Sequence, residues 1–81
     1  MEDYAALAEA VKARRTELGI KQTDSEFYGG PSTGTLRNVE QCARVGYHRR
    51  TFKDIEAMLK WRSGTCNRIL AGSEHKVQAL V

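Results

Sequence analysis

The stretch GGPSTGTLRNVE, residues 29–40, decides the fold. It opens with Gly29-Gly30-Pro31, which no helix interior tolerates, because proline lacks an N–H group and clashes with the preceding turn. Ser32 follows, and its hydroxyl can accept hydrogen bonds from the unpaired N–H groups of a new helix. Leu36 and Val39 then lie three residues apart, on one face of that helix. The stretch therefore predicts a tight turn that leads into a helix.

Apolar residues at three- and four-residue steps predict further helices on both sides of this turn. Gly19 is expected to end the first helix, and Thr51 with Asp54 resembles a capping box that begins a later one. The expected helices cover about residues 3–18, 22–28, 32–41, 51–60 and 63–72. The residues expected to be buried are Tyr4, Leu7, Ala8, Val11, Leu18, Leu36, Val39, Phe52, Ile55, Leu59, Trp61, Cys66, Ile69 and Leu70. The sequence thus predicts an all-α fold, a compact five-helix bundle.

The length bounds the number of domains. Eighty-one residues, 41% apolar and 28% charged, are expected to form one small domain over residues 1–72. The remainder, 73–81, is expected to be a tail that is either flexible or in contact with a second copy. No apolar run approaches the roughly 20 residues of a membrane-spanning helix, and the acidic N-terminus is unlike a signal peptide. We therefore expect a cytoplasmic protein without a membrane partner.

The residues that could carry redox, metal or catalytic chemistry do not cluster. Cys42 and Cys66 lack a C-x-x-C spacing, so both are interpreted as packing residues rather than metal ligands or a disulfide. His48 and His75 have no base, nucleophile or ligand partner nearby in the sequence. The glycines form no G-x-x-x-x-G-K phosphate loop. We expect no metal, no cofactor and no enzymatic activity.

Positive charge is concentrated after the turn. The chain carries 13 Lys and Arg against 10 Asp and Glu, a net charge of +3. Residues 37–53 hold five of these basic residues and one acidic residue, which gives +4, so the rest of the chain sums to −1. In a helix-turn-helix, the second helix enters the DNA major groove by its N-terminal residues while flanking segments hold phosphates. The cations fit that use, and a merely solvated charged face is the alternative.

Gly34 stands inside the predicted helix 32–41, where glycine costs about 1 kcal/mol relative to alanine. Such a glycine is justified where a helix closely approaches a DNA groove. A close contact with another helix would justify it equally.

Nine residues follow the pattern R-x-x-x-G-x-x-Q and then G-x-S-x-x-T-[IL]-x-x-[IV]-E: Arg15, Gly19, Gln22, Gly30, Ser32, Thr35, Leu36, Val39 and Glu40. On these residues the chain resembles the helix-turn-helix family of Cro and the phage-lambda-type repressors, also called XRE-like. The resemblance spans about Leu7 to Gly72. The motif Gly-Gly-Pro-Ser-x-x-Thr-Leu is similar to a variant of the family that is common in high-GC bacteria and their phages. It implies a lambda-repressor-like DNA-binding domain. Such a regulator, a repressor or Cro-like protein, would bind a double-stranded DNA operator as a homodimer in a bacterium or phage-infected host.

The resemblance also implies a role for individual residues. Arg37 is the preferred base reader, because a guanidinium can bond both O6 and N7 of guanine. The other positions implied in base readout are Gln22, Thr33 and Gly34. The implied phosphate contacts are Asn38, Arg44, His48, Arg49 and Arg50. Arg15 and Glu40 are expected to form a structural ion pair between the first and third helices.

One departure from the family lies in the second expected helix. Ser25-Glu26 replaces the family's usual Leu-Ala, so Phe27 or Tyr28 is expected to fill the gap unless the helix is short and mobile. Glu26 is expected to face solvent, because an unpaired buried carboxylate is costly. The departure favours one alternative function, a protein-binding adaptor such as an antitoxin or antirepressor; a nonspecific nucleoid binder is another. The expected dimer contact is the last helix with Val77, Leu80 and Val81.

Overall fold

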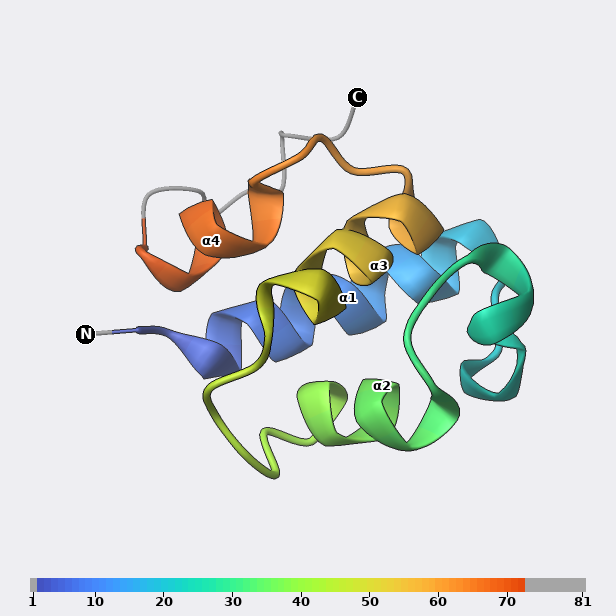
Figure 1. Cartoon of the computed structure of the whole chain (residues 1–81), viewed down its shortest axis with the longest axis horizontal. Coiled ribbons are helices and arrows are strands. Elements are labelled where there is room, and N and C mark those ends of the chain that lie inside the picture. Colours follow the sequence, from blue (N-terminus) through green and yellow to red (C-terminus); the bar gives the residue numbers. More distant parts are fainter. Residues whose placement is uncertain (1, 73–81) are drawn as a thin grey trace.

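Helix α1, Tyr4–Leu18, is the centre of the fold. In the computed structural model, which describes residues 2–72, α1 runs behind α3 with α4 and α2 on either side (Figure 1). At its start the Asp3 carboxylate accepts a hydrogen bond from the Ala6 N–H at 2.9 Å. Gly19 ends it in the left-handed conformation, with φ at 73°, as the sequence predicted. Both ends of the central helix are therefore fixed by local residues.

The segment expected as the second helix, residues 22–28, forms two 3-10 helices, η1 (Gln22–Asp24) and η2 (Glu26–Tyr28). The all-α prediction is confirmed, but the five-helix prediction is wrong, because residues 2–72 hold four α-helices and no β-strand. An α-helix draws most of its stability from packing an apolar face, and the only buried residue of this segment is Ser25. The segment therefore folds as two short turns.

Helix α2, Thr33–Glu40, follows the turn where the sequence predicted a helix. Ser32 caps it, since its hydroxyl oxygen accepts a hydrogen bond from the Thr35 N–H at 3.1 Å. The last helix, α4, covers Thr65–Leu70 and lies inside the predicted range.

Helix α3, Arg49–Leu59, begins two residues before the expected start. The capping box predicted at Thr51 is wrong, because the N–H of Thr51 donates to the carbonyl of His48 at 3.0 Å, already within the first turn. Lys60 ends the helix in the left-handed conformation, with φ at 59°. Arg49 and Arg50 thus belong to the first turn of α3 rather than to the loop before it.

One apolar core lies between the four helices. The predicted residues that are buried are Leu7, Ala8, Val11, Leu36, Val39, Phe52, Ile55, Leu59, Trp61, Cys66, Ile69 and Leu70. Tyr4 and Leu18 are only partly buried. The packing role predicted for Cys42 is wrong, because its side chain is exposed. Within the described residues, we find no helix with the length and apolar character needed to cross a membrane.

Candidate nucleic-acid interface

An ion pair and a side-chain amide fix the C-terminal end of α2. The Arg15 guanidinium donates to both carboxylate oxygens of Glu40, at 2.6 and 2.9 Å, and to the Ile20 carbonyl at 2.8 Å. The Glu40 side chain is only 3% exposed, and its hydrogen bond raises the pKa of Arg15. Gln22 donates its side-chain amide to Glu40 Oε1 at 3.0 Å. This network joins α1, η1 and α2, and it uses one N–H of the Gln22 amide.

Ser25 locks the turn that precedes α2. Its side chain is fully buried, and its Oγ donates to the Pro31 carbonyl at 2.6 Å. The Ser25 carbonyl accepts a hydrogen bond from the Gly30 N–H at 2.8 Å. A Cβ at Gly30 would stand 2.6 Å from Ser25 Oγ and 2.7 Å from Sδ of Met58. The turn is therefore a rigid unit packed against α3, with no room for a side chain at Gly30.

The expectation that Phe27 or Tyr28 fills the gap beside Ser25-Glu26 is wrong. Both aromatic side chains point to solvent, 85% and 48% exposed, and their rings meet edge to face at 5.2 Å. Ser25 itself is the anchor, because a small side chain whose hydroxyl is hydrogen-bonded can be buried without leaving an unsatisfied polar atom. Glu26 is exposed, as predicted.

Thr33, Gly34, Arg37 and Asn38 form an outer face of α2 that takes no part in the core. Thr33 is partly buried and donates its hydroxyl to the Gln22 carbonyl at 3.4 Å. Gly34 and Arg37 are exposed, and Asn38 is partly so. A Cβ at Gly34 would meet none of the described atoms within 4 Å, so no helix contact requires this glycine. Arg37 makes no ion pair with any residue of 2–72.

Aromatic rings hold the loop that follows α2. The Tyr4 hydroxyl accepts a hydrogen bond from the Gly46 N–H at 3.0 Å. The Tyr47 ring centroid lies 6.2 Å from that of Tyr4 and 6.2 Å from that of Phe52. The Arg44 guanidinium lies over the Tyr47 ring, 4.8 Å from its centroid. Burial raises the pKa of Tyr47. Arg44 is therefore exposed but held in one orientation.

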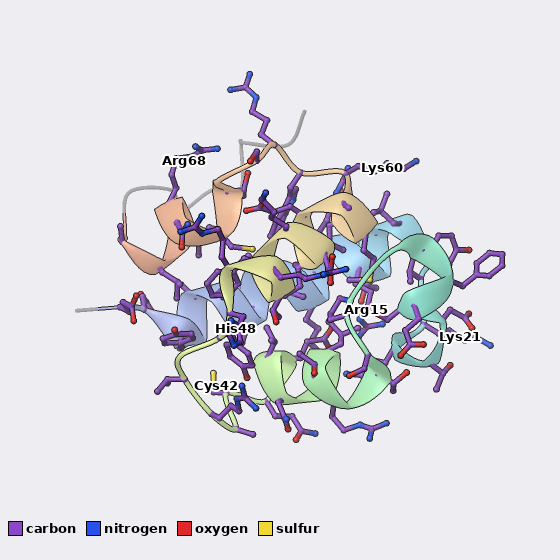
Figure 2. The ribbon with its side chains drawn as sticks, in the orientation of Figure 1. Arg15, Lys21, Cys42, His48, Lys60 and Arg68 are labelled. Atoms are coloured by element: carbon purple, nitrogen blue, oxygen red, sulfur yellow. The ribbon has the colours of Figure 1, made fainter. Side chains whose placement is uncertain are left out.

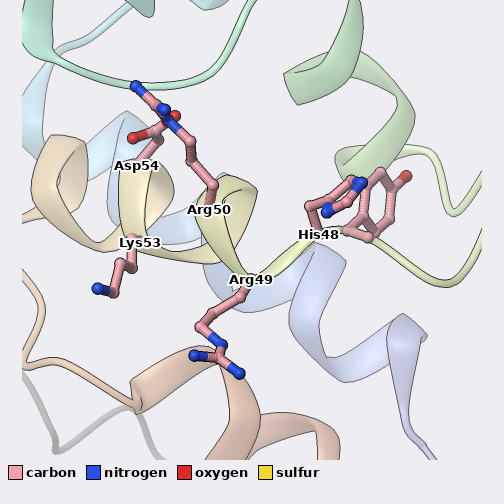
Figure 3. Close-up of a pocket in the computed structure, with 6 residues that line it drawn as sticks. His48, Arg49, Arg50, Lys53 and Asp54 are labelled. Atoms are coloured by element: carbon pink, nitrogen blue, oxygen red, sulfur yellow. The ribbon is translucent and has the colours of Figure 1, made fainter.

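An open hollow at the N-terminus of α3 is lined by Tyr47, His48, Arg49, Arg50, Lys53 and Asp54 (Figure 3). Within the described chain no side chain caps this helix, so its first N–H groups can bind an anion. Figure 3 shows Arg49 pointing toward α4, whereas Arg50 lies beside Asp54. Asp54 shares one face of α3 with Met58, four residues on, and Met58 packs against Gly30. The structure therefore brings Arg50, but not Arg49, to the side of the turn before α2.

Within residues 2–72, the cations of this surface form no ion pair with a carboxylate. The ion pairs among residues 2–72 are Arg14–Glu17 and Arg15–Glu40. Neither involves the basic residues of 37–53, which are Arg37, Arg44, Arg49, Arg50 and Lys53. Unpaired cations can displace counterions from a phosphate backbone. In the same part of the chain, no group of three or more His, Cys, Asp or Glu side chains is placed to hold a metal ion.

Comparison with known proteins gives no relative: the chain matches no protein-family model, no curated protein and no solved structure.

Sequence reasoning gave no site role to three residues that shape this surface. Lys53 was counted in the basic stretch, and it could have been given a contact because it lies three residues after Arg50 and so shares its side of a helix. Tyr47, which orients Arg44, is the aromatic residue of the loop between α2 and α3, and that was a usable signal. Ser25 gave no local signal, because the carbonyl that it binds belongs to Pro31, six residues away.

Proposed function

We propose that this chain is a sequence-specific DNA-binding transcriptional regulator, a repressor or Cro-like protein that binds an operator as a homodimer. Residues 2–72 are then a lambda-repressor-like domain, in which η1, η2, the turn and α2 form the helix-turn-helix, with α2 in the major groove. The observation that carries the proposal is the outer face of α2. There, space is open over Gly34, and Arg37 has no ion-pair partner among the described residues.

Arg37 is the proposed base reader. Its guanidinium is exposed on the outer face of α2, so a bidentate bond to guanine breaks no ion pair within residues 2–72. Thr33 and Gly34 lie in the first turn of the same helix, where short side chains allow close approach to the groove. Gln22 has a smaller part, because one N–H of its amide is held by Glu40, so the second N–H and the amide oxygen are left for a base.

The phosphate contacts are proposed on both flanks of α2. Arg44, held over Tyr47, extends the surface beyond the C-terminal end of the helix. Arg50 and the uncapped N–H groups of α3 lie on the side of the turn, with His48 beside them. Asn38 is a further proposed phosphate contact. Arg49 contributes less to phosphate binding, because its side chain points toward α4 (Figure 3). Loss of Arg50 should therefore weaken DNA binding more than loss of its neighbour Arg49.

Selection of bound sequences from a random duplex pool tests the proposal. We expect an inverted repeat, with half-sites about one helical turn apart. If each protomer neutralises about four phosphates, the logarithm of the affinity should fall against the logarithm of salt concentration with a slope near −7. Arg37→Ala should relax preference at one base pair, at a cost of about 1–3 kcal/mol. Arg62→Ala removes an exposed arginine outside this surface and is the matched control.

Three results would count against the proposal. An affinity for duplex DNA that does not change with salt concentration would rule out the proposed DNA binding. A steep response without any selected sequence would favour a nonspecific nucleoid binder. A uniform loss of affinity across all sequences in Arg37→Ala would make this residue a phosphate contact rather than a base reader.

A protein-binding adaptor, such as an antitoxin or antirepressor, is the second candidate function. The exposed pair Phe27 and Tyr28 favours it, because contiguous exposed aromatic surface marks sites of protein interaction. An adaptor of this kind would lack the salt-dependent binding to duplex DNA described above.

A further inference from the structure

Two neighbouring aromatic side chains lie outside the core. Four of the six aromatic residues of the chain pack against the core: Tyr4, Tyr47, Phe52 and Trp61. Phe27 and Tyr28 instead lie side by side on η2 and are exposed. The other exposed large hydrophobic side chain among the described residues, Val45, belongs to the loop after α2. Contiguous exposed apolar surface is typical of an interaction site, whereas single exposed hydrophobic residues are ordinary.

The aromatic pair is displayed on a rigid support. The N–H of Tyr28 donates to the Ser25 carbonyl at 3.1 Å, and the N–H of Gly29 donates to the Glu26 carbonyl at 3.1 Å. Ser25 is in turn buried and bound to Pro31 at 2.6 Å. A surface held in one conformation before binding loses little conformational entropy on association. The two rings are therefore prepared for a partner rather than left loose.

Exposed charges of both signs lie on the same short segment as the rings, at residues 21–26. Lys21, Asp24 and Glu26 are exposed, and none of them forms an ion pair within residues 2–72. Figure 2 shows Lys21 at the edge of the molecule, away from Cys42 and His48. The two carboxylates repel DNA phosphates, which argues against a nucleic-acid partner here. A rim with both signs is complementary to itself, because a two-fold axis can place the lysine of one copy opposite the acids of the other.

We infer that Phe27 and Tyr28 are the centre of a self-association surface, on which two copies of this chain pack about a two-fold axis with Lys21, Asp24 and Glu26 as the rim. An aromatic side chain buries about 150–250 Å², so two rings give well under the roughly 800 Å² per partner of a stable interface. The association is therefore weak and depends on concentration. It goes beyond the proposed DNA binding, which specifies neither this surface nor its residues.

Sedimentation equilibrium of the full chain without DNA tests this surface, over roughly 10 μM to 1 mM, where so small an interface associates. The mass should rise with concentration from 9.1 kDa toward twice that value. The double variant Phe27→Ser, Tyr28→Ser should weaken association at least tenfold. Its circular dichroism should be unchanged, because both side chains are exposed. Val45→Ser removes an exposed hydrophobic residue elsewhere and should associate like the parent chain.

A charge exchange tests the two-fold pairing itself. Lys21→Glu alone and Glu26→Lys alone should each weaken association, because each places like charges opposite one another across the two-fold axis. The two changes together should restore it, and a double variant as weak as the single ones overturns the pairing. A parent chain that stays at 9.1 kDa throughout, or association that survives loss of both rings, overturns the surface. Since DNA is absent from these measurements, failure of the DNA selection leaves this result untouched, and the converse also holds.

Discussion

Replacing Gly34 by alanine should raise stability and lower DNA affinity at the same time. Gly34 lies in the first turn of α2, outside the left-handed φ range, and a Cβ there would meet no described atom within 4 Å. Alanine at such a position stabilises a protein by about 0.4–1 kcal/mol, chiefly by restricting the unfolded chain. In a domain of this size, that gain raises the Tm by about 2–8 °C.

The same methyl group should hinder DNA binding, because the proposed function places Gly34 against the groove. We expect a loss of roughly tenfold, which corresponds to about 1.4 kcal/mol. Urea unfolding followed by circular dichroism measures the stability, and fluorescence anisotropy with the selected duplex measures the affinity. A destabilised Gly34→Ala protein would refute the reasoning about open space. A stabilised protein with unchanged affinity would show that this face of α2 does not approach DNA.

Gly30→Ala is the matched control, since it adds the same methyl group four residues earlier. Its Cβ would lie 2.6 Å from Ser25 Oγ and 3.0 Å from the Ser25 carbonyl oxygen. Overpacking of this kind costs about 1–3 kcal/mol. The two glycines should therefore shift the urea midpoint in opposite directions, and a shift in the same direction would contradict the assignment of one to the interior and the other to the surface.

Two further predictions concern the ion pairs and the thiols. Glu40→Gln should lower the free energy of unfolding in urea by about 3 kcal/mol, because it leaves the Arg15 guanidinium, 14% exposed, without its counter-charge. Glu17→Gln changes a side chain that is 63% exposed and should lower it by less than about 1 kcal/mol. Equal losses in the two variants would contradict the distinction between a buried and an exposed ion pair. Cys42 is exposed and should react readily with a disulfide reagent at pH 8, whereas burial raises the pKa of the Cys66 thiol, so Cys66 should react only on unfolding. Two equally fast thiols in the folded protein would be the contrary result.

The parts of the fold that could be predicted from the sequence are those set by local chemistry. Ser32 caps α2 and Gly19 ends α1 because each acts on neighbours within one turn. The second expected helix failed because its outcome depends on Ser25, whose partner lies beyond the segment. Apolar periodicity also predicts burial correctly only where the apolar residues face the core, and Phe27 faces solvent instead. The start of α3 was missed because no side chain in the described residues marks it.

The candidate site shows the same division. The basic stretch could be predicted from the sequence. The different directions in which Arg49 and Arg50 point could not, because they depend on where α3 begins. Consecutive residues of a helix point in different directions, so an expected helix that began only at residue 51 hid their divergence (Figure 3). Asp54 likewise belongs to the hollow only because α3 carries it there.

The arrangement of α2 explains how a short helix can be both anchored and available to a ligand. Its last residue, Glu40, carries the buried network with Arg15, and Leu36 and Val39 fill the core. Structural demands therefore fall on the inner face and the C-terminal end. The outer face is relieved of them, so Gly34 and Arg37 can change with little effect on the fold. A helix that must read DNA needs this separation, because base preference can then vary while the domain that presents it stays the same.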